Sequence, residues 1–123
     1  MQTINGERHK IALTFGYGHT DWNVREYFLG HLANAVCESF GGFRYTTGTG
    51  FWTADGNSEP PFTGEIFEED SVTLIVTVEE SPESAVSILR ASAMEAKNQT
   101  AGDVPMEWVN VEITQAQAAH FKM

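Results

Sequence analysis

Three consecutive acidic residues, Glu68, Glu69 and Asp70, stand at the start of the most apolar segment of the sequence, 72–78. Carboxylates held this close repel one another, so a cation that binds to them relieves the repulsion. An ammonium or sulfonium group of a ligand is such a cation, and an aromatic wall beside the carboxylates adds the attraction of the ring faces. The alternative is a solvated strand end, whose charges only protect the apolar strand from aggregation.

A second unusual segment is 48–52, which contains Gly-Thr-Gly-Phe-Trp. Two glycines on one face of a strand weaken it, and the close approach of a ligand or of neighbouring backbone is one reason for them. A bulge, or a close contact between sheet and helix, is the alternative. Phe51 and Trp52 point to opposite faces of a strand, so one can pack while the other lines a pocket. Tyr45 and Tyr17 are further aromatic residues for the wall of a cation site.

Other common chemical motifs are missing from the chain. Gly16-Tyr17-Gly18 is followed by Asp21 where a dinucleotide-binding fingerprint has its third glycine, and no Gly-Lys-Ser/Thr phosphate loop occurs. The four histidines are scattered without the spacing of metal ligands. The single Cys37 excludes an internal disulfide and a zinc site built from cysteines. We therefore expect neither a bound metal nor a cofactor.

The elements that position these residues are predicted by apolar periodicity and turn residues. The pattern predicts strands at 11–15, 43–54, 72–78 and 108–113, and helices at about 21–40 and 82–98. The tail is expected to add a short helical turn. The order β-α-β-β-α-β predicts a ferredoxin-like α+β fold, a four-stranded antiparallel sheet with two helices on one face.

The length of 123 residues fits one domain. We place this domain at 10–113, between an N-terminal polar segment, 1–9, and a C-terminal tail, 114–123. One side of the predicted sheet stays uncovered and holds aromatic and β-branched residues. An exposed face of this kind usually marks an interface, which predicts a symmetric homo-oligomer, with a trimer as the preferred state.

Seventeen acidic against seven basic residues give a net charge of −10. Affinity for nucleic acid depends on Lys and Arg, so we expect no nucleic-acid partner. The apolar stretches are too short to cross a membrane, and the first eight residues lack an apolar signal core, which predicts a cytoplasmic protein with no membrane partner. The acidic surface either serves solubility alone or attracts cationic small molecules.

The order and spacing of these features resemble those of the phage-encoded S-adenosylmethionine (SAM) lyases, formerly called SAM hydrolases. A Thr-Gly-aromatic segment of that family is matched here by 49–52. A pair of glutamates that opens an apolar strand is matched by Glu68 and Glu69, and a later helix with an internal arginine is matched by the helix that carries Arg90. The resemblance spans roughly residues 10–113.

The resemblance implies an enzyme that degrades SAM without a metal or cofactor. The carboxylate of SAM attacks its own γ-carbon and yields 5′-methylthioadenosine and L-homoserine lactone. By the same resemblance, Glu69 is the catalytic residue that binds the substrate ammonium, with Glu68 beside it. The residues implied to hold the adenine and the sulfonium are Phe51, Trp52, Tyr45 and Tyr17.

The resemblance also implies a trimer with sites between subunits. It places the protein in the cytoplasm of a host bacterium, where loss of SAM counters SAM-dependent restriction-modification. Two other classes of function remain open. A non-catalytic oligomeric module would bind or sequester a nucleotide-like small ligand and release it unchanged. An interaction protein would mimic nucleic acid with its acidic surface, although glycines and aromatic residues near the acids favour a pocket.

Overall fold

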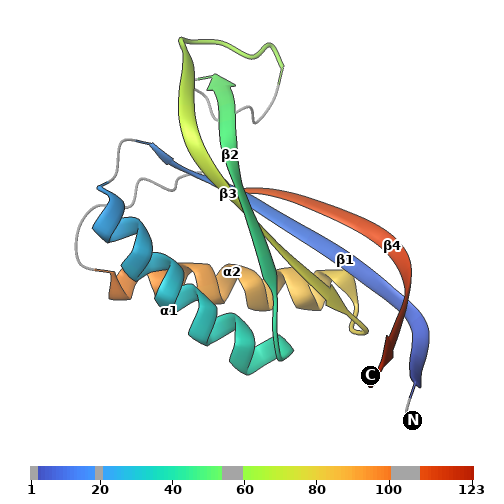
Figure 1. Ribbon diagram of the computed structural model, residues 1–123. Coiled ribbons are helices and arrows are strands. Elements are labelled where there is room, and N and C mark those ends of the chain that lie inside the picture. The colour runs from blue at the N-terminus through green and yellow to red at the C-terminus, as the bar shows by residue number, and fades with distance from the viewer. Residues whose placement is uncertain (1–2, 19–20, 54–59, 101–108) are drawn as a thin grey trace.

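The computed structural model describes residues 3–18, 21–53, 60–100 and 109–123. Within these residues the chain forms four strands and two helices in the order β-α-β-β-α-β (Figure 1). The elements are β1 (Thr3–Gly18), α1 (Trp22–Phe40), β2 (Arg44–Thr53), β3 (Ile66–Val78), α2 (Pro82–Gln99) and β4 (Val109–Phe121). The predicted ferredoxin-like α+β arrangement is confirmed.

The strands form one antiparallel sheet in the order β2-β3-β1-β4. The central strand β1 pairs with β3 on one side and with β4 on the other, so that Leu13 lies opposite both Leu74 and Val111. Both helices lie on the same side of the sheet (Figure 1). We call the opposite side the open face.

Alternation along the strands decides which side chains meet the helices. The buried strand residues are Ile11, Leu13, Phe15 and Tyr17 of β1 and Val72, Leu74, Val76 and Val78 of β3. The helices complete the core with Phe28, Leu32 and Val36 of α1 and Ala85, Leu89, Ala93 and Ala96 of α2. Burying a large apolar side chain stabilises a fold by about 1.5–3 kcal/mol, so this core fixes β1, β3 and α1 relative to one another.

The ends of the helices follow local sequence signals. Gly41 ends α1 with φ +80°, a left-handed conformation that glycine adopts without strain, and its N–H donates to the carbonyl of Cys37 at 2.8 Å. Ser81 begins α2, because its hydroxyl accepts a hydrogen bond from the N–H of Ser84 at 3.2 Å. Pro82 then occupies the first turn, where its missing N–H has no helical partner to lose.

The upper part of the β2–β3 hairpin projects beyond the helices (Figure 1). We call residues 48–53 and 66–71 the arm. Large apolar side chains on it stay exposed, with Phe51 65% and Ile66 72% accessible. The arm is therefore held mainly by the ladder between β2 and β3 and presents both of its faces.

The strands β1, β3 and β4 are longer than the sequence pattern predicts, whereas β2 is close to its predicted bounds. β3 begins at Ile66, so the three acidic residues lie inside a strand and not before it. β1 and β4 pair from Thr3–Phe121 to Phe15–Val109, so residues 3–9 and 114–121, which we set apart from the domain, also form strand. The helical turn expected in the tail is wrong, because cross-strand pairing with β1 outweighs the local helix preference of its Ala and Gln residues.

Neither helix in the described part of the chain is long and apolar enough to cross a membrane.

Candidate functional site

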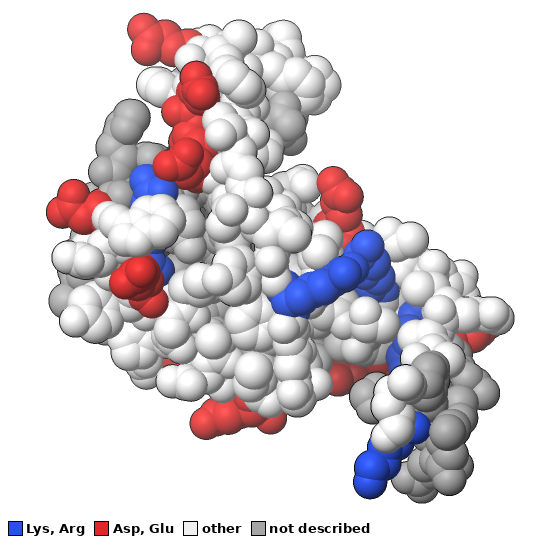
Figure 2. All heavy atoms as spheres, in the orientation of Figure 1, with Lys and Arg blue, Asp and Glu red and all other residues white. Residues whose placement is uncertain are grey.

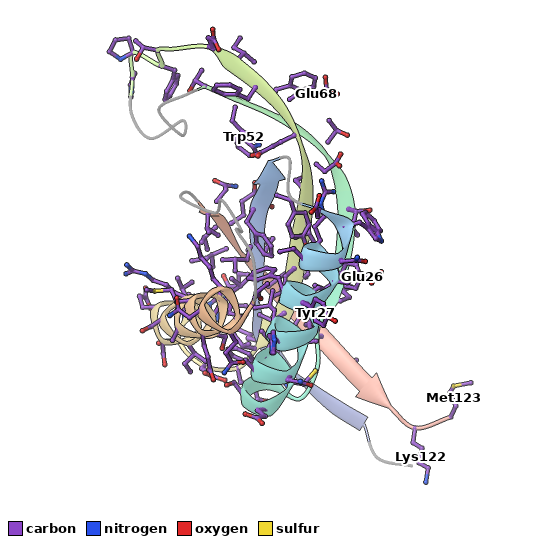
Figure 3. All side chains as sticks on the ribbon, turned by 90° about the vertical axis from the view of Figure 1, so that its left-hand side faces the viewer. Glu26, Tyr27, Trp52, Glu68, Lys122 and Met123 are labelled. Carbon is purple, nitrogen blue, oxygen red and sulfur yellow. The ribbon has the colours of Figure 1, made fainter. Side chains whose placement is uncertain are left out.

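The six predicted site residues divide between the two faces of the sheet. The register places Phe51 opposite Glu68, and Gly50 opposite Glu69. Residues directly opposite each other share a face, and successive residues alternate between faces. The side that faces the helices carries Tyr17, Tyr45, Phe51 and Glu68, and the open face carries Trp52 and Glu69. Figure 3 shows Trp52 and Glu68 on the arm, above the α1 residues Glu26 and Tyr27.

A pocket of about 420 Å³ lies on the helix side, between the first turns of α1 and the strands β2 and β3. We call it the α1 pocket. Its lining residues are Tyr17, Trp22, Arg25, Glu26, Leu29, Tyr45, Thr47, Gly48, Thr49, Asp70, Ser71 and Val72. Phe51 and Glu68 are not among the lining residues, but they form the next cross-strand pair on the same face beyond Thr49 and Asp70, which places them at the rim of the pocket on the arm side.

Arg25 is the basic residue of the α1 pocket. Its Nη1 donates to Oδ2 of Asp70 at 2.8 Å, and its guanidinium carbon lies 5.1 Å from the ring centroid of Tyr17 and 5.6 Å from that of Trp22. The side chain of Arg25 is 13% exposed, whereas that of Asp70 is 61% exposed. Two aromatic rings and one carboxylate therefore hold the guanidinium in a defined position.

The core fixes the Tyr17 wall of the pocket. The ring of Tyr17 makes edge-to-face contacts with Phe15 at 5.9 Å and with Phe28 at 6.3 Å between centroids. Burial raises the pKa of Tyr17 to about 12, although the nearby charge of Arg25 acts in the opposite direction. The hydroxyl therefore stays protonated near neutral pH and presents a polar but uncharged group.

The α1 pocket combines groups that suit a ligand with both an aromatic ring and charges. Glu26 and Asp70 supply negative charge and Arg25 supplies positive charge. Trp22, 67% exposed, and Tyr45, 49% exposed, offer ring surface on which a flat apolar group can stack. Figure 2 shows further acidic side chains over the arm.

On the open face, glycines make room for the two predicted residues of that side. The Glu69 carboxylate occupies the space that a Cβ on Gly16 would need, and the indole of Trp52 covers Gly50, whose Cβ would lie 2.9 Å from Nε1. The buried indole N–H has no hydrogen-bond partner among the described residues. A side chain of the same strand, and not a helix or a bulge, therefore makes the close approach at Gly50.

Sequence reasoning missed several residues of the pocket, among them Trp22 and Arg25. Their spacing of three, followed by Leu29 four residues later, places them on one helical face. That face was not recognised because the apolar stripe through Phe28 marks the neighbouring, buried face of α1. Asp70 was interpreted as one of three acidic residues that repel one another and attract a cation, and in the structure it is paired with the cationic Arg25.

The described residues contain no group of three or more His, Cys, Asp or Glu side chains that could hold a metal ion.

Solved structures of other proteins have a fold similar to that of this chain. No protein-family model matches the chain, and no curated protein matches it. A phage SAM lyase in complex with S-methyl-5′-thioadenosine is similar with a TM-score of 0.57 and 16% identity, over 94% of this chain and 90% of that one. A phage SAM lyase in the apo state gives a TM-score of 0.55 and 16% identity, over 93% and 89%. The resemblance to phage SAM lyases is thereby confirmed at the level of the fold.

Proposed function

We propose that this chain is a SAM lyase that converts SAM to 5′-methylthioadenosine and L-homoserine lactone. The observation that carries the proposal is the α1 pocket, which joins aromatic walls to a paired acid and base in a fold similar to that of a lyase bound to methylthioadenosine. Activity of this kind in a bacterial cytoplasm removes SAM from restriction-modification enzymes, and we include that role in the proposal.

The reaction needs little proton chemistry. A carboxylate oxygen of SAM attacks the γ-carbon, the bond between that carbon and sulfur breaks, and its electron pair neutralises the sulfonium. The amino group remains an ammonium, so atoms and charge balance without water. The protein has only to hold the carboxylate in line with the carbon–sulfur bond, and orientation of this kind is worth about 7–11 kcal/mol.

The α1 pocket supports the binding half of this mechanism. Tyr45 and Trp22 offer stacking surface for adenine, and the acidic side chains attract the positive ammonium and sulfonium. Phe51 and Glu68 at the rim extend the same surface towards the arm. In this proposal Tyr17 closes the inner wall as a neutral phenol.

Glu69 and Trp52 belong to the same site only if a second copy supplies them, because they lie on the other face of the arm. A cyclic trimer joins its subunits head to tail, so two different faces of the chain meet at every interface. We therefore propose that the α1 pocket of one copy faces the Glu69 and Trp52 of its neighbour. Glu69 then binds the substrate ammonium, and the indole N–H of Trp52, which has no partner among the described residues, gains an acceptor from the ligand.

The test is incubation of purified protein with SAM, followed by chromatography of the products. We expect loss of SAM with equal formation of methylthioadenosine, with no metal or cofactor added. SAM that binds and is recovered unchanged would replace the lyase with the sequestering module, and SAM that neither binds nor reacts would remove both.

A further inference from the structure

We propose that Arg25 selects the substrate by its free α-carboxylate, which makes the α1 pocket specific for nucleosides that carry a complete α-amino acid. The inference rests on the proposed function and adds a residue that recognises one part of the substrate. It begins from the ion pair between Arg25 and Asp70, which lines the pocket.

The position of Arg25 is fixed before any ligand arrives. The rings of Tyr17 and Trp22 lie against the guanidinium, 5.1 and 5.6 Å from its central carbon, and the side chain is largely buried. A guanidinium carries five N–H donors in a rigid fork that matches a carboxylate, and Asp70 engages it through Nη1. A pre-oriented fork of this kind binds a ligand carboxylate with little loss of entropy.

Asp70, the partner of Arg25, is placed so that a ligand carboxylate can replace it at the guanidinium. Asp70 is 61% exposed and lies on β3 in the arm, so its side chain can turn while that of Arg25 stays between the rings. An α-amino acid presents an ammonium and a carboxylate side by side. The Arg25–Asp70 pair, with 2.8 Å between its charged atoms, presents the complementary charges in the same way. The ligand carboxylate therefore takes the guanidinium, and Asp70 remains beside the ammonium.

The contact between Arg25 and the substrate carboxylate also sets the orientation of the substrate in the pocket. In this proposal the carboxylate binds Arg25, the nucleoside packs against Tyr45, and the substrate folds back between them. That conformation brings a carboxylate oxygen towards the γ-carbon, as the cyclisation requires. Arg25 thus both selects the substrate and positions the attacking group.

Binding of two unreactive compounds, measured by calorimetry, tests the inference apart from turnover. S-adenosylhomocysteine carries the amino acid but no sulfonium, and methylthioadenosine carries the nucleoside but no amino acid. We expect Arg25→Gln to weaken S-adenosylhomocysteine roughly 10- to 100-fold, the range for hydrogen bonds to a charged group, and to change methylthioadenosine less than about 2-fold. Retained binding of methylthioadenosine shows that the variant has folded.

Two further variants sharpen the comparison. Arg25→Lys keeps the charge but lacks the planar fork, and we expect it to recover only part of the affinity for S-adenosylhomocysteine. Arg44→Gln removes an exposed base at the far end of β2, outside the pocket, and we expect it to change neither affinity.

Equal weakening of both compounds by Arg25→Gln would overturn the inference, because Arg25 would then only shape the pocket. Unchanged affinity for both would overturn it as well. If the wild-type protein converts SAM while either of these results is found, the lyase stands and only the role of Arg25 is lost. If the wild-type protein neither binds the two compounds nor converts SAM, the proposed function and the inference fail together.

Discussion

Glu68 and Glu69 are adjacent in the sequence, yet their carboxylates serve opposite faces of β3. Glu68 faces the rim of the α1 pocket, whereas Glu69 lies over Gly16 on the open face. The sequence identified both residues by type, and strand alternation separates them once β3 is known to begin at Ile66. Arg25 could not be identified in this way, because its importance comes from Tyr17 on β1 and Asp70 on β3, which the fold brings to its side chain.

The two glutamates have different expected mutant effects. Glu69→Gln keeps size and removes charge, and we expect turnover to fall about 10²-fold, the loss that a misplacement of about 1 Å in the reacting groups causes. Glu68→Gln removes an exposed rim charge, and we expect KM to rise less than about 10-fold with kcat little changed. Steady-state kinetics of the two variants measure both effects. Full activity of Glu69→Gln would remove its catalytic role.

Tyr17 gives a pH dependence to stability. Its pKa is raised to about 12 in the folded state, whereas an unfolded tyrosine titrates near 10. The stabilisation is complete below pH 10 and is lost as pH rises from 10 to 12, because the unfolded chain releases this proton first. We expect Tyr17→Phe to lose less stability than wild type across that interval in urea denaturation. Parallel curves for the two proteins would contradict this assignment.

The elements themselves were predictable where periodicity was strong. The stripe through Phe28, Leu32 and Val36 fixed α1, and the cap at Ser81 fixed the start of α2. Strand ends were predicted less well, since pairing extends β1 and β4 into segments without apolar alternation. The arm could not be predicted, because the point at which the hairpin passes beyond the helices depends on how the layers pack.

The contact between Gly16 of β1 and the Glu69 side chain of β3 leads to a testable prediction. A Cβ in Gly16→Ala displaces the Glu69 carboxylate, which is the end of a flexible side chain, so we expect the fold to persist while turnover falls more than about 10-fold. Gly30→Ala is the matched control, since nothing lies within 4 Å of its Cβ and alanine favours a helix by about 1 kcal/mol. We expect it to raise the urea midpoint and keep activity. Equal activity in the two variants would separate Gly16 from the site.

The proposed site residues lie on two faces of the sheet, and this arrangement predicts an oligomeric state for the whole molecule. A single copy places Glu69 and the α1 pocket on opposite sides of one sheet, and the proposed head-to-tail trimer would bring them together. Light scattering is expected to give three times the 13.6 kDa of one chain. A stable monomer with full lyase activity would contradict a site between copies.

Mixing of two variants, each altered in a different half of the proposed site, tests this arrangement further. Glu69→Gln retains the α1 pocket, and Asp70→Asn retains Glu69, so a ring that contains both variants has interfaces with two intact halves. After denaturation and joint refolding in equal amounts, we expect roughly a quarter of wild-type activity, because half of the pockets are intact and half of their neighbours are. Activity no greater than that of the separately refolded variants would place both residues in the same half.

The reaction in water labelled with oxygen-18 distinguishes cyclisation of SAM from its hydrolysis, and so tests the proposed lyase activity. Cyclisation uses only the oxygens of SAM, so we expect unlabelled homoserine lactone beside methylthioadenosine in mass spectra. Later opening of the lactone puts the label in the carboxyl group of homoserine. A label in the homoserine hydroxyl would show that water attacks the γ-carbon, and it would contradict the lyase.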